Sequence, residues 1–134
     1  MKISSRGRNA VRIMVDIATD KEEFTNISGI SKRLNITNKY IEQIISKLVK
    51  AKLVTSLRGA QGGYKLARKP EEINIAEILT AMGDMPELAP CLKEHKDCPA
   101  RAKCTTIGVW ETLSALIFDY LEKITLQNLI EKTY

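Results

Sequence analysis

Hydrophobic residues in the first fifty positions repeat at helical spacing in three separate stretches. Residues 8–19 place apolar side chains on one stripe, and a shorter apolar stretch after Asn26 predicts a second helix that Asn26 caps. The third stretch follows Thr37, a residue type that also caps helices. Its apolar positions recur at i, i+3, i+4, i+7 and i+8, namely Ile41, Ile44, Ile45, Leu48 and Val49. The pattern predicts three helices, of which the third is the clearest.

The opposite face of the third helix carries amides, a carboxylate and cations. These residues are Asn38, Lys39, Glu42, Gln43, Ser46, Lys47 and Lys50. Such groups can address base edges and phosphates in the major groove of DNA. Because a structural helix would show the same apolar stripe, it is the polar face that favours a helix that reads DNA.

A strand-like pattern replaces the helical one over residues 53–66. Residues 53–57 and 64–66 are predicted as two short strands, and the turn between them contains three glycines. Glycine adopts positive φ in tight turns and lets a backbone approach another surface closely. The turn lacks the Gly-Lys-Ser/Thr ending of a nucleotide-binding loop. Three helices and a glycine-rich hairpin tipped by Arg58 therefore predict a winged helix-turn-helix, a mainly α fold with a small β-hairpin.

The chain changes character after Pro70. Asn74, with Glu77 three residues on, predicts a capped helix that Gly83 ends. Residues 84–103 contain three prolines and no clear periodicity, so we expect an ordered loop without regular structure. Loops of this length inside a compact domain are usually functional or held in place by something else.

A long helix with a near-heptad apolar seam is predicted over residues 106–123. The seam consists of Trp110, Leu113, Ile117, Tyr120, Leu121 and Ile124. At 1.5 Å per residue such a helix is about 27 Å long, and one small domain has little core to cover it. We therefore expect a two-fold dimer contact along this helix, followed by a last short helix that Thr125 caps.

Charge divides the 134 residues into two regions. Residues 1–70 carry fifteen Lys and Arg against five Asp and Glu, whereas residues 71–134 carry six against eleven. The excess of positive charge in residues 1–70 suggests that only this half of the chain binds a polyanion. We expect a DNA-binding region over 1–70 and a cysteine loop with dimerisation helices over 71–134, within one compact domain. With no apolar run of some twenty residues and no targeting segment, a cytoplasmic protein without membrane contact is expected.

The three cysteines, Cys91, Cys98 and Cys104, all fall in one polar stretch. Thiolates grouped among Lys, Glu and Asp bind a soft metal or an iron–sulfur cluster, or form redox-labile bonds. An odd number argues against a disulfide framework. The single histidine, His95, lies inside the same stretch, so a Cys₃His zinc site is the alternative. No nucleophile-and-base pattern accompanies these residues, so an enzyme is not expected.

Several motifs together resemble the winged-helix regulators of the IscR, NsrR and CymR type. They are the opening Met-Lys-Ile-Ser-Ser-Arg-Gly-Arg, Tyr40-Ile-Glu-Gln43, the wing Arg58-Gly-Ala-Gln-Gly-Gly-Tyr64, the cysteine loop and Ile124-Thr-Leu126. The resemblance implies a bacterial homodimeric transcription factor whose binding to duplex DNA responds to an iron–sulfur cluster held by the three cysteines. It also implies that the third helix and the wing read DNA. The candidate DNA-binding residues are Thr37, Asn38, Tyr40, Glu42, Gln43, Lys47, Arg58, Gly59 and Gln61.

The chain departs from the cluster-binding pattern in three places. Six residues separate the first two cysteines, where IscR has five; Ile107 stands where IscR has a histidine ligand; and Arg8 stands where some NsrR-like members have an acidic one. CymR-type members lack the triplet, so the fold alone does not imply a cluster. The cluster type, two-iron or four-iron, and its fourth ligand are open. The candidates for that ligand are Glu94, His95, Asp97, Thr105 and Thr106.

Overall fold

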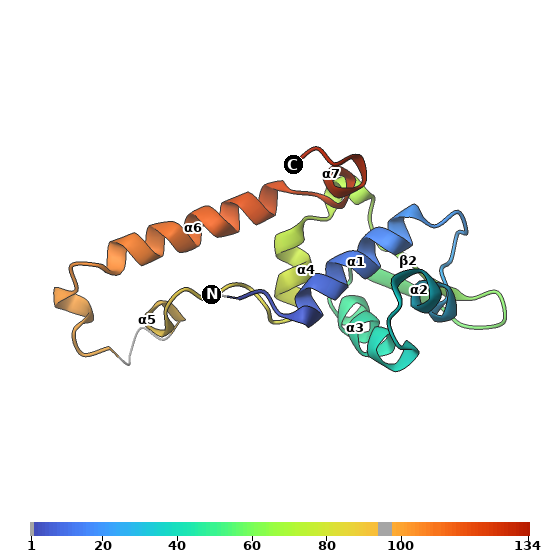
Figure 1. Cartoon of the computed structure of the whole chain (residues 1–134), viewed down its shortest axis with the longest axis horizontal. Helices are drawn as coiled ribbons and strands as arrows, with labels where there is room; N and C mark the ends of the chain where they lie inside the picture. The colour runs from blue at the N-terminus through green and yellow to red at the C-terminus, as the bar shows by residue number, and fades with distance from the viewer. Residues whose placement is uncertain (1, 94–97) are drawn as a thin grey trace.

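One long helix extends away from a body of shorter helices and a two-stranded hairpin (Figure 1). The computed structural model describes residues 2–93 and 98–134, so the candidate ligands Glu94, His95 and Asp97 lie outside the described residues. The elements are α1 (Ser5–Thr19), α2 (Ile27–Leu34), α3 (Asn38–Lys50), β1 (Val54–Leu57), β2 (Gly63–Leu66), η1 (Pro70–Glu72), α4 (Ile75–Ala81), α5 (Pro90–Lys93), η2 (Arg101–Lys103), α6 (Ile107–Lys123) and α7 (Leu126–Glu131). This order confirms the predicted mainly α fold with a small hairpin.

The helices begin at the caps that the sequence predicted. The side chains of Asn26, Thr37, Asn74 and Thr125 each accept a hydrogen bond from the backbone N–H three residues further on. Such a bond satisfies one of the free donors at a helix start. Helix α1 starts three residues before the predicted residue 8, because Ser4 caps it in the same way.

A single hydrophobic core joins the two halves of the chain. Ile13 of α1 and Ile44 of α3 are fully buried, and they share the core with Ile73 and Leu126 from beyond Pro70. Each such side chain contributes about 1.5–3 kcal/mol on burial. The winged-helix half is therefore packed together with α4 and α7.

The wing is an antiparallel hairpin fixed at its base. Its register runs from Val54 opposite Leu66 to Leu57 opposite Gly63. Thr25, just before α2, exchanges two backbone hydrogen bonds of 2.8 Å with Tyr64 of β2. A Cβ atom on the neighbouring Gly63 would lie 2.5 Å from the carbonyl oxygen of Thr25. Glycine is therefore needed for this close approach, which sets the position of the wing relative to α2.

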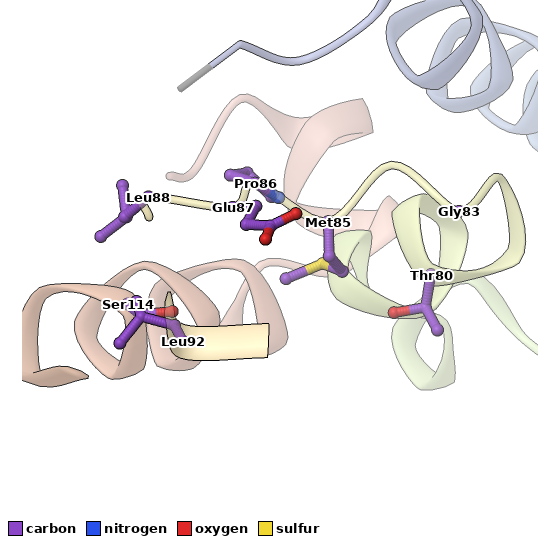
Figure 2. Close-up of a pocket in the computed structure, with 8 residues that line it drawn as sticks. All are labelled: Thr80, Gly83, Met85, Pro86, Glu87, Leu88, Leu92 and Ser114. Atoms are coloured by element: carbon purple, nitrogen blue, oxygen red, sulfur yellow. The ribbon is translucent and has the colours of Figure 1, made fainter. Parts of the chain in front are cut away.

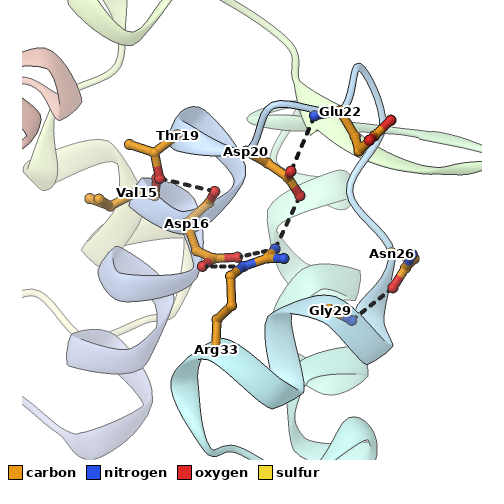
Figure 3. A network of polar contacts seen from close by, with 8 residues as sticks. All are labelled: Val15, Asp16, Thr19, Asp20, Glu22, Asn26, Gly29 and Arg33. Atoms are coloured by element: carbon orange, nitrogen blue, oxygen red, sulfur yellow. Dashed lines mark hydrogen bonds and ion pairs between the residues drawn. The ribbon is translucent and has the colours of Figure 1, made fainter.

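An ion-pair network connects α1 to α2 (Figure 3). Arg33 of α2 binds Asp16 of α1 through two hydrogen bonds, of 2.9 and 2.7 Å, and also reaches Asp20 at 3.1 Å. The guanidinium fork matches the carboxylate geometry, which is the strong form of such a pair. The network helps to fix the orientation of α2, and thereby of the turn into α3.

The prediction of a loop without regular structure over 84–103 was wrong. This segment contains the short helix α5 and the 3₁₀ turn η2. Pro90 stands at the first position of α5, where its missing N–H costs no hydrogen bond. Elements of three or four residues are too short to show a hydrophobic period, which is why the sequence pattern did not reveal them.

Two backbone hydrogen bonds attach the C-terminal end of α6 to the body. The Ile75 N–H donates to the carbonyl oxygen of Ile124 at 3.0 Å, and the Leu126 N–H donates to that of Ile73 at 2.9 Å. From this anchor α6 runs outward, and α5 lies at the end of the molecule opposite to the wing (Figure 1). Any influence of the cysteines on the wing must therefore pass through intervening elements.

Candidate nucleic-acid interface and cysteine site

Helix α3 presents its polar face to solvent as predicted. Its apolar stripe is buried in the core, while its other face is exposed at Asn38, Glu42, Gln43 and Lys47. Two other candidates also serve the fold. Tyr40 is half-buried against the core, and the exposed Thr37 accepts the capping hydrogen bond from the Tyr40 N–H at 3.4 Å.

The tip of the wing is equally accessible. Arg58, Gly59 and Gln61 are exposed, and Gly59 has φ of 116°, a left-handed conformation that glycine adopts without strain. In the part of the chain that the structure describes, neither Arg58 nor Lys47 of α3 forms an ion pair, in contrast to Arg33. Their charges are thus not neutralised within the fold, as a surface that meets phosphates requires.

The structure places the three candidate thiols along the segment that leads from α4 into α6. Cys91 lies in α5, Cys98 lies before η2, and Cys104 ends η2. All three are free thiols and half-buried. Sequence reasoning missed Arg101, which lies between the second and third cysteine and hydrogen-bonds to the backbone of the first. The one feature of the sequence that could have pointed to Arg101 is that this cation lies between Cys98 and Cys104.

The environment of Cys104 favours its thiolate form. The Thr106 hydroxyl lies 3.5 Å from Sγ and lowers the pKa of the Cys104 thiol, with a smaller contribution from the backbone N–H groups of Thr106 and Ile107. The thiolate is the form that binds metals and acts as a nucleophile. Of the candidate fourth ligands that are described, Thr106 is thus in contact with a thiol.

The donor set fits a soft metal or an iron–sulfur cluster in its chemistry. Three thiols on one connected segment supply the ligands that such groups prefer. Among residues 2–93 and 98–134, however, no three His, Cys, Asp or Glu side chains are grouped closely enough to hold an ion. Ligation of one group by all three cysteines would therefore require their thiols to lie closer together.

Comparison with known proteins assigns this arrangement to a family. Residues 3–132 match the Rrf2 family, described as an iron-dependent transcriptional regulator. The chain belongs to the Rrf2 family. It is accordingly a DNA-binding transcription regulator of the winged-helix type, and the family is not one of enzymes. The resemblance drawn from the wing and the cysteine triplet is confirmed.

Relatives of this Rrf2 regulator match it over nearly its whole length. A Neisseria meningitidis serogroup A protein, named as an HTH-type transcriptional regulator, is 41% identical over 98% of this chain and 89% of its own length. IscR of Aliivibrio salmonicida is 37% identical over 97% of this chain and 77% of its own.

Two solved structures share the fold. T. potens IscR is 31% identical with a TM-score of 0.77, covering 100% of this chain and 89% of its own. CymR of B. subtilis, whose structure is described as that of the global cysteine regulator, is 29% identical with a TM-score of 0.78, covering 100% of this chain and 99% of its own.

Helix α6 of this Rrf2 regulator leaves most of its apolar surface uncovered. Val109 and Leu116 are each 59% exposed, and with Leu113 and Tyr120 they recur at i, i+4, i+7 and i+11 on one face. Of the predicted seam, Trp110, Leu113 and Tyr120 are exposed, whereas Ile117, Leu121 and Ile124 are half-buried. Leu116, Ile117, Tyr120 and Leu121 together line a groove beside the N-terminal segment. The exposed apolar face defined by Val109, Leu113, Leu116 and Tyr120 therefore shares Leu113 and Tyr120 with the predicted seam.

An open pocket separates α6 from the end of α4 (Figure 2). Its lining residues are Thr80, Gly83, Met85, Pro86, Glu87, Leu88, Leu92 and Ser114. Leu92 of α5 and Ser114 of α6 line the same pocket, so the helix that carries Cys91 lies next to α6.

None of the described helices is long and apolar enough to cross a bilayer.

Proposed function

We propose that this Rrf2 regulator is a homodimer whose binding to an operator is modulated by an iron–sulfur cluster held by Cys91, Cys98 and Cys104. The observation that carries the proposal is that three half-buried free thiols lie in the segment that leads directly into the exposed helix α6. The iron-dependent description of the family and the IscR relatives support it. In this proposal residues 1–70 bind DNA in the cytoplasm, and residues 71–134 hold the cluster and form the dimer.

The proposed DNA contacts are the exposed face of α3 and the tip of the wing. They comprise Thr37, Asn38, Tyr40, Glu42, Gln43, Lys47, Arg58, Gly59 and Gln61. In a dimer the two α3 helices would read half-sites roughly 34–36 Å apart. Replacing Arg58 by Ala should weaken binding to any duplex. Replacing Gln43 by Ala should relax sequence preference instead, by about 1–3 kcal/mol if its amide contacts a base in two places.

Salt dependence and the two variants test these contacts together. For about six to ten phosphate contacts per dimer, affinity should fall by about three to five decades between 50 and 200 mM salt. Fluorescence anisotropy on operator and on unrelated duplex measures both effects. A flat response to salt would contradict DNA binding through this basic surface.

The dimer contact is proposed along the free face of α6. Val109, Leu113, Leu116 and Tyr120 expose large apolar surface there, and a two-fold partner helix would remove it from water. Ala115 is exposed on another face of the same helix, so it is the position for a control substitution that should leave assembly intact.

The bound cluster would supply a group whose stability responds to iron, oxidants or small ligands. The cysteines would hold it, and the fourth position is proposed to be filled by one of Glu94, His95, Asp97, Thr105 or Thr106, or by an exchangeable oxygen ligand. The Thr106 hydroxyl already lies next to Cys104 Sγ. A two-iron cluster needs four protein donors, whereas a four-iron cluster can leave one iron open.

Anaerobic purification followed by visible spectroscopy tests the cofactor. We expect a brown protein with iron and acid-labile sulfide, and loss of colour when any one cysteine is replaced by Ala. The winged-helix half should stay folded in these variants, as measured by circular dichroism. A colourless protein with one zinc per chain would instead establish the Cys₃His alternative. Equal operator affinity of the wild type and the triple Ala variant would remove the sensing role.

A further inference from the structure

Arg101 is hydrogen-bonded to the backbone of every cysteine in the chain. Its N–H donates to the carbonyl oxygen of Cys98 at 3.1 Å, and its own carbonyl accepts from the N–H of Cys104 at 3.1 Å. Its guanidinium Nη1 donates to the carbonyl oxygen of Cys91 at 2.8 Å. Cys91 is ten residues away in the sequence, so this last contact links the first cysteine to the stretch between the second and the third.

The same guanidinium reaches α6. Nη2 of Arg101 donates to Oε1 of Glu111 at 2.8 Å, in the second turn of the helix. The side chains of Arg101 and Glu111 are 26% and 49% exposed, so the bond to the Cys91 carbonyl is partly buried, whereas the ion pair with Glu111 lies at the surface. One side chain thus joins the first cysteine to the helix that carries the free apolar face.

We propose that Arg101 is the positioning residue that sets the spacing of the three cysteines and couples their loop to α6. The coupling to operator binding rests on the proposed function; the positioning of the thiols does not. A group bound by the three thiols would shift Cys91, and the bond from Arg101 would carry that movement to Glu111. A coupling of this kind needs contacts that differ between the bound and the empty form, and in this proposal the two bonds of the guanidinium are those contacts.

The chain contains a matched control for this contact. Arg68 makes the same pair of bonds, one to the carbonyl oxygen of Glu72 at 3.0 Å and one to the Glu77 carboxylate at 2.6 Å. These residues lie around η1 and α4, and neither of the two bonds involves a cysteine. Arg68→Gln therefore removes an equivalent pair of bonds without altering the cysteine loop directly.

Thiol labelling of the metal-free protein tests the positioning role. The probe is 5,5′-dithiobis(2-nitrobenzoic acid), with the modified cysteine identified by mass spectrometry. Arg101→Gln should speed the labelling of Cys91 by about three- to tenfold, the factor that corresponds to one lost hydrogen bond. Glu111→Gln should leave that rate within about twofold, because the bond to the Cys91 carbonyl remains. Equal Cys91 labelling rates in Arg101→Gln and Arg68→Gln would overturn the proposal.

The reconstituted protein tests the coupling role. Arg101→Gln should lose its visible chromophore to an iron chelator about three- to tenfold faster than the wild type. Glu111→Gln should keep the chromophore, while the ratio of operator affinities with and without it falls towards one. An unchanged ratio in Glu111→Gln would show that the coupling does not run through this bond.

The two readouts separate this proposal from the proposed function. If the wild type takes up no iron, the proposed iron–sulfur cluster is wrong, yet the labelling rates still decide whether Arg101 positions the cysteines. If the wild type holds a cluster and the labelling rates of Arg101→Gln and Arg68→Gln are equal, the proposed cluster is supported and the proposed positioning role of Arg101 is rejected.

Discussion

The network around Arg33 offers a stability prediction whose size follows from its geometry (Figure 3). The Arg33 side chain is 44% exposed, but the Asp16 and Asp20 side chains that it binds are only 9% and 13% exposed. An exposed ion pair contributes about 0.2–1 kcal/mol, and a hydrogen bond to a charged group contributes about 1.5–3 kcal/mol. Discounting the upper range for the exposure of Arg33, we expect a coupling energy between Arg33 and Asp16 of about 1–2 kcal/mol.

Urea unfolding, followed by circular dichroism, measures this coupling in a double-mutant cycle. The variants are Arg33→Ala, Asp16→Ala and the pair together. Arg33→Ala should be the most damaging single change, because it leaves two carboxylates that had shared one cation. With a slope of about 2 kcal/mol per molar urea, its midpoint should fall by about 1 M. The Arg68–Glu77 pair, in which both side chains are more than one-third exposed, should give a smaller coupling in a parallel cycle.

Acidity supplies a second readout of the same network. The backbone N–H of Glu22 lowers the pKa of Asp20, against the effect of burial, and the charge of Arg33 adds to the lowering. The folded chain therefore keeps this carboxylate ionised where the unfolded chain would protonate it. Its stabilisation is full above the unfolded value of 3.8 and is lost as the pH falls through the lower folded value. A coupling energy between Arg33 and Asp16 below about 0.3 kcal/mol at neutral pH would refute this account of the network.

Three further predictions concern assembly, the wing and the thiols. Replacing Val109 and Leu116 together by Asp should give a monomer in sedimentation, because unpaired charge in the proposed interface costs several kcal/mol; a dimer would place the contact elsewhere. Gly63→Ala should destabilise the chain by about 1–3 kcal/mol in urea and weaken operator binding, since the added carbon meets backbone. An unchanged urea midpoint would mean that the wing shifts freely. Thr106→Val should raise the pKa of the Cys104 thiol in the metal-free protein, moving the pH dependence of its alkylation upward; an unmoved profile would exclude the hydroxyl as the main cause.

The amino-acid sequence by itself determined the local elements. The caps Asn26, Thr37, Asn74 and Thr125 act on a backbone N–H three residues away, so their partners are present in the sequence pattern. The glycine-rich turn and the helical stripes are likewise local. Together with the cysteine triplet they were enough to predict the fold and the family.

Tertiary structure decided what depends on residues far apart in the chain. Leu116 and Ile117 of α6 both line the groove beside the N-terminal segment, yet Leu116 is 59% exposed and Ile117 is half-buried, a difference that no helical period records. The bond from Arg101 to the Cys91 carbonyl spans ten residues and requires α5 and η2, both too short to leave a pattern. Local hydrogen bonds and stripes can be read from spacing, whereas exposure and long-range contacts are settled only when the elements pack.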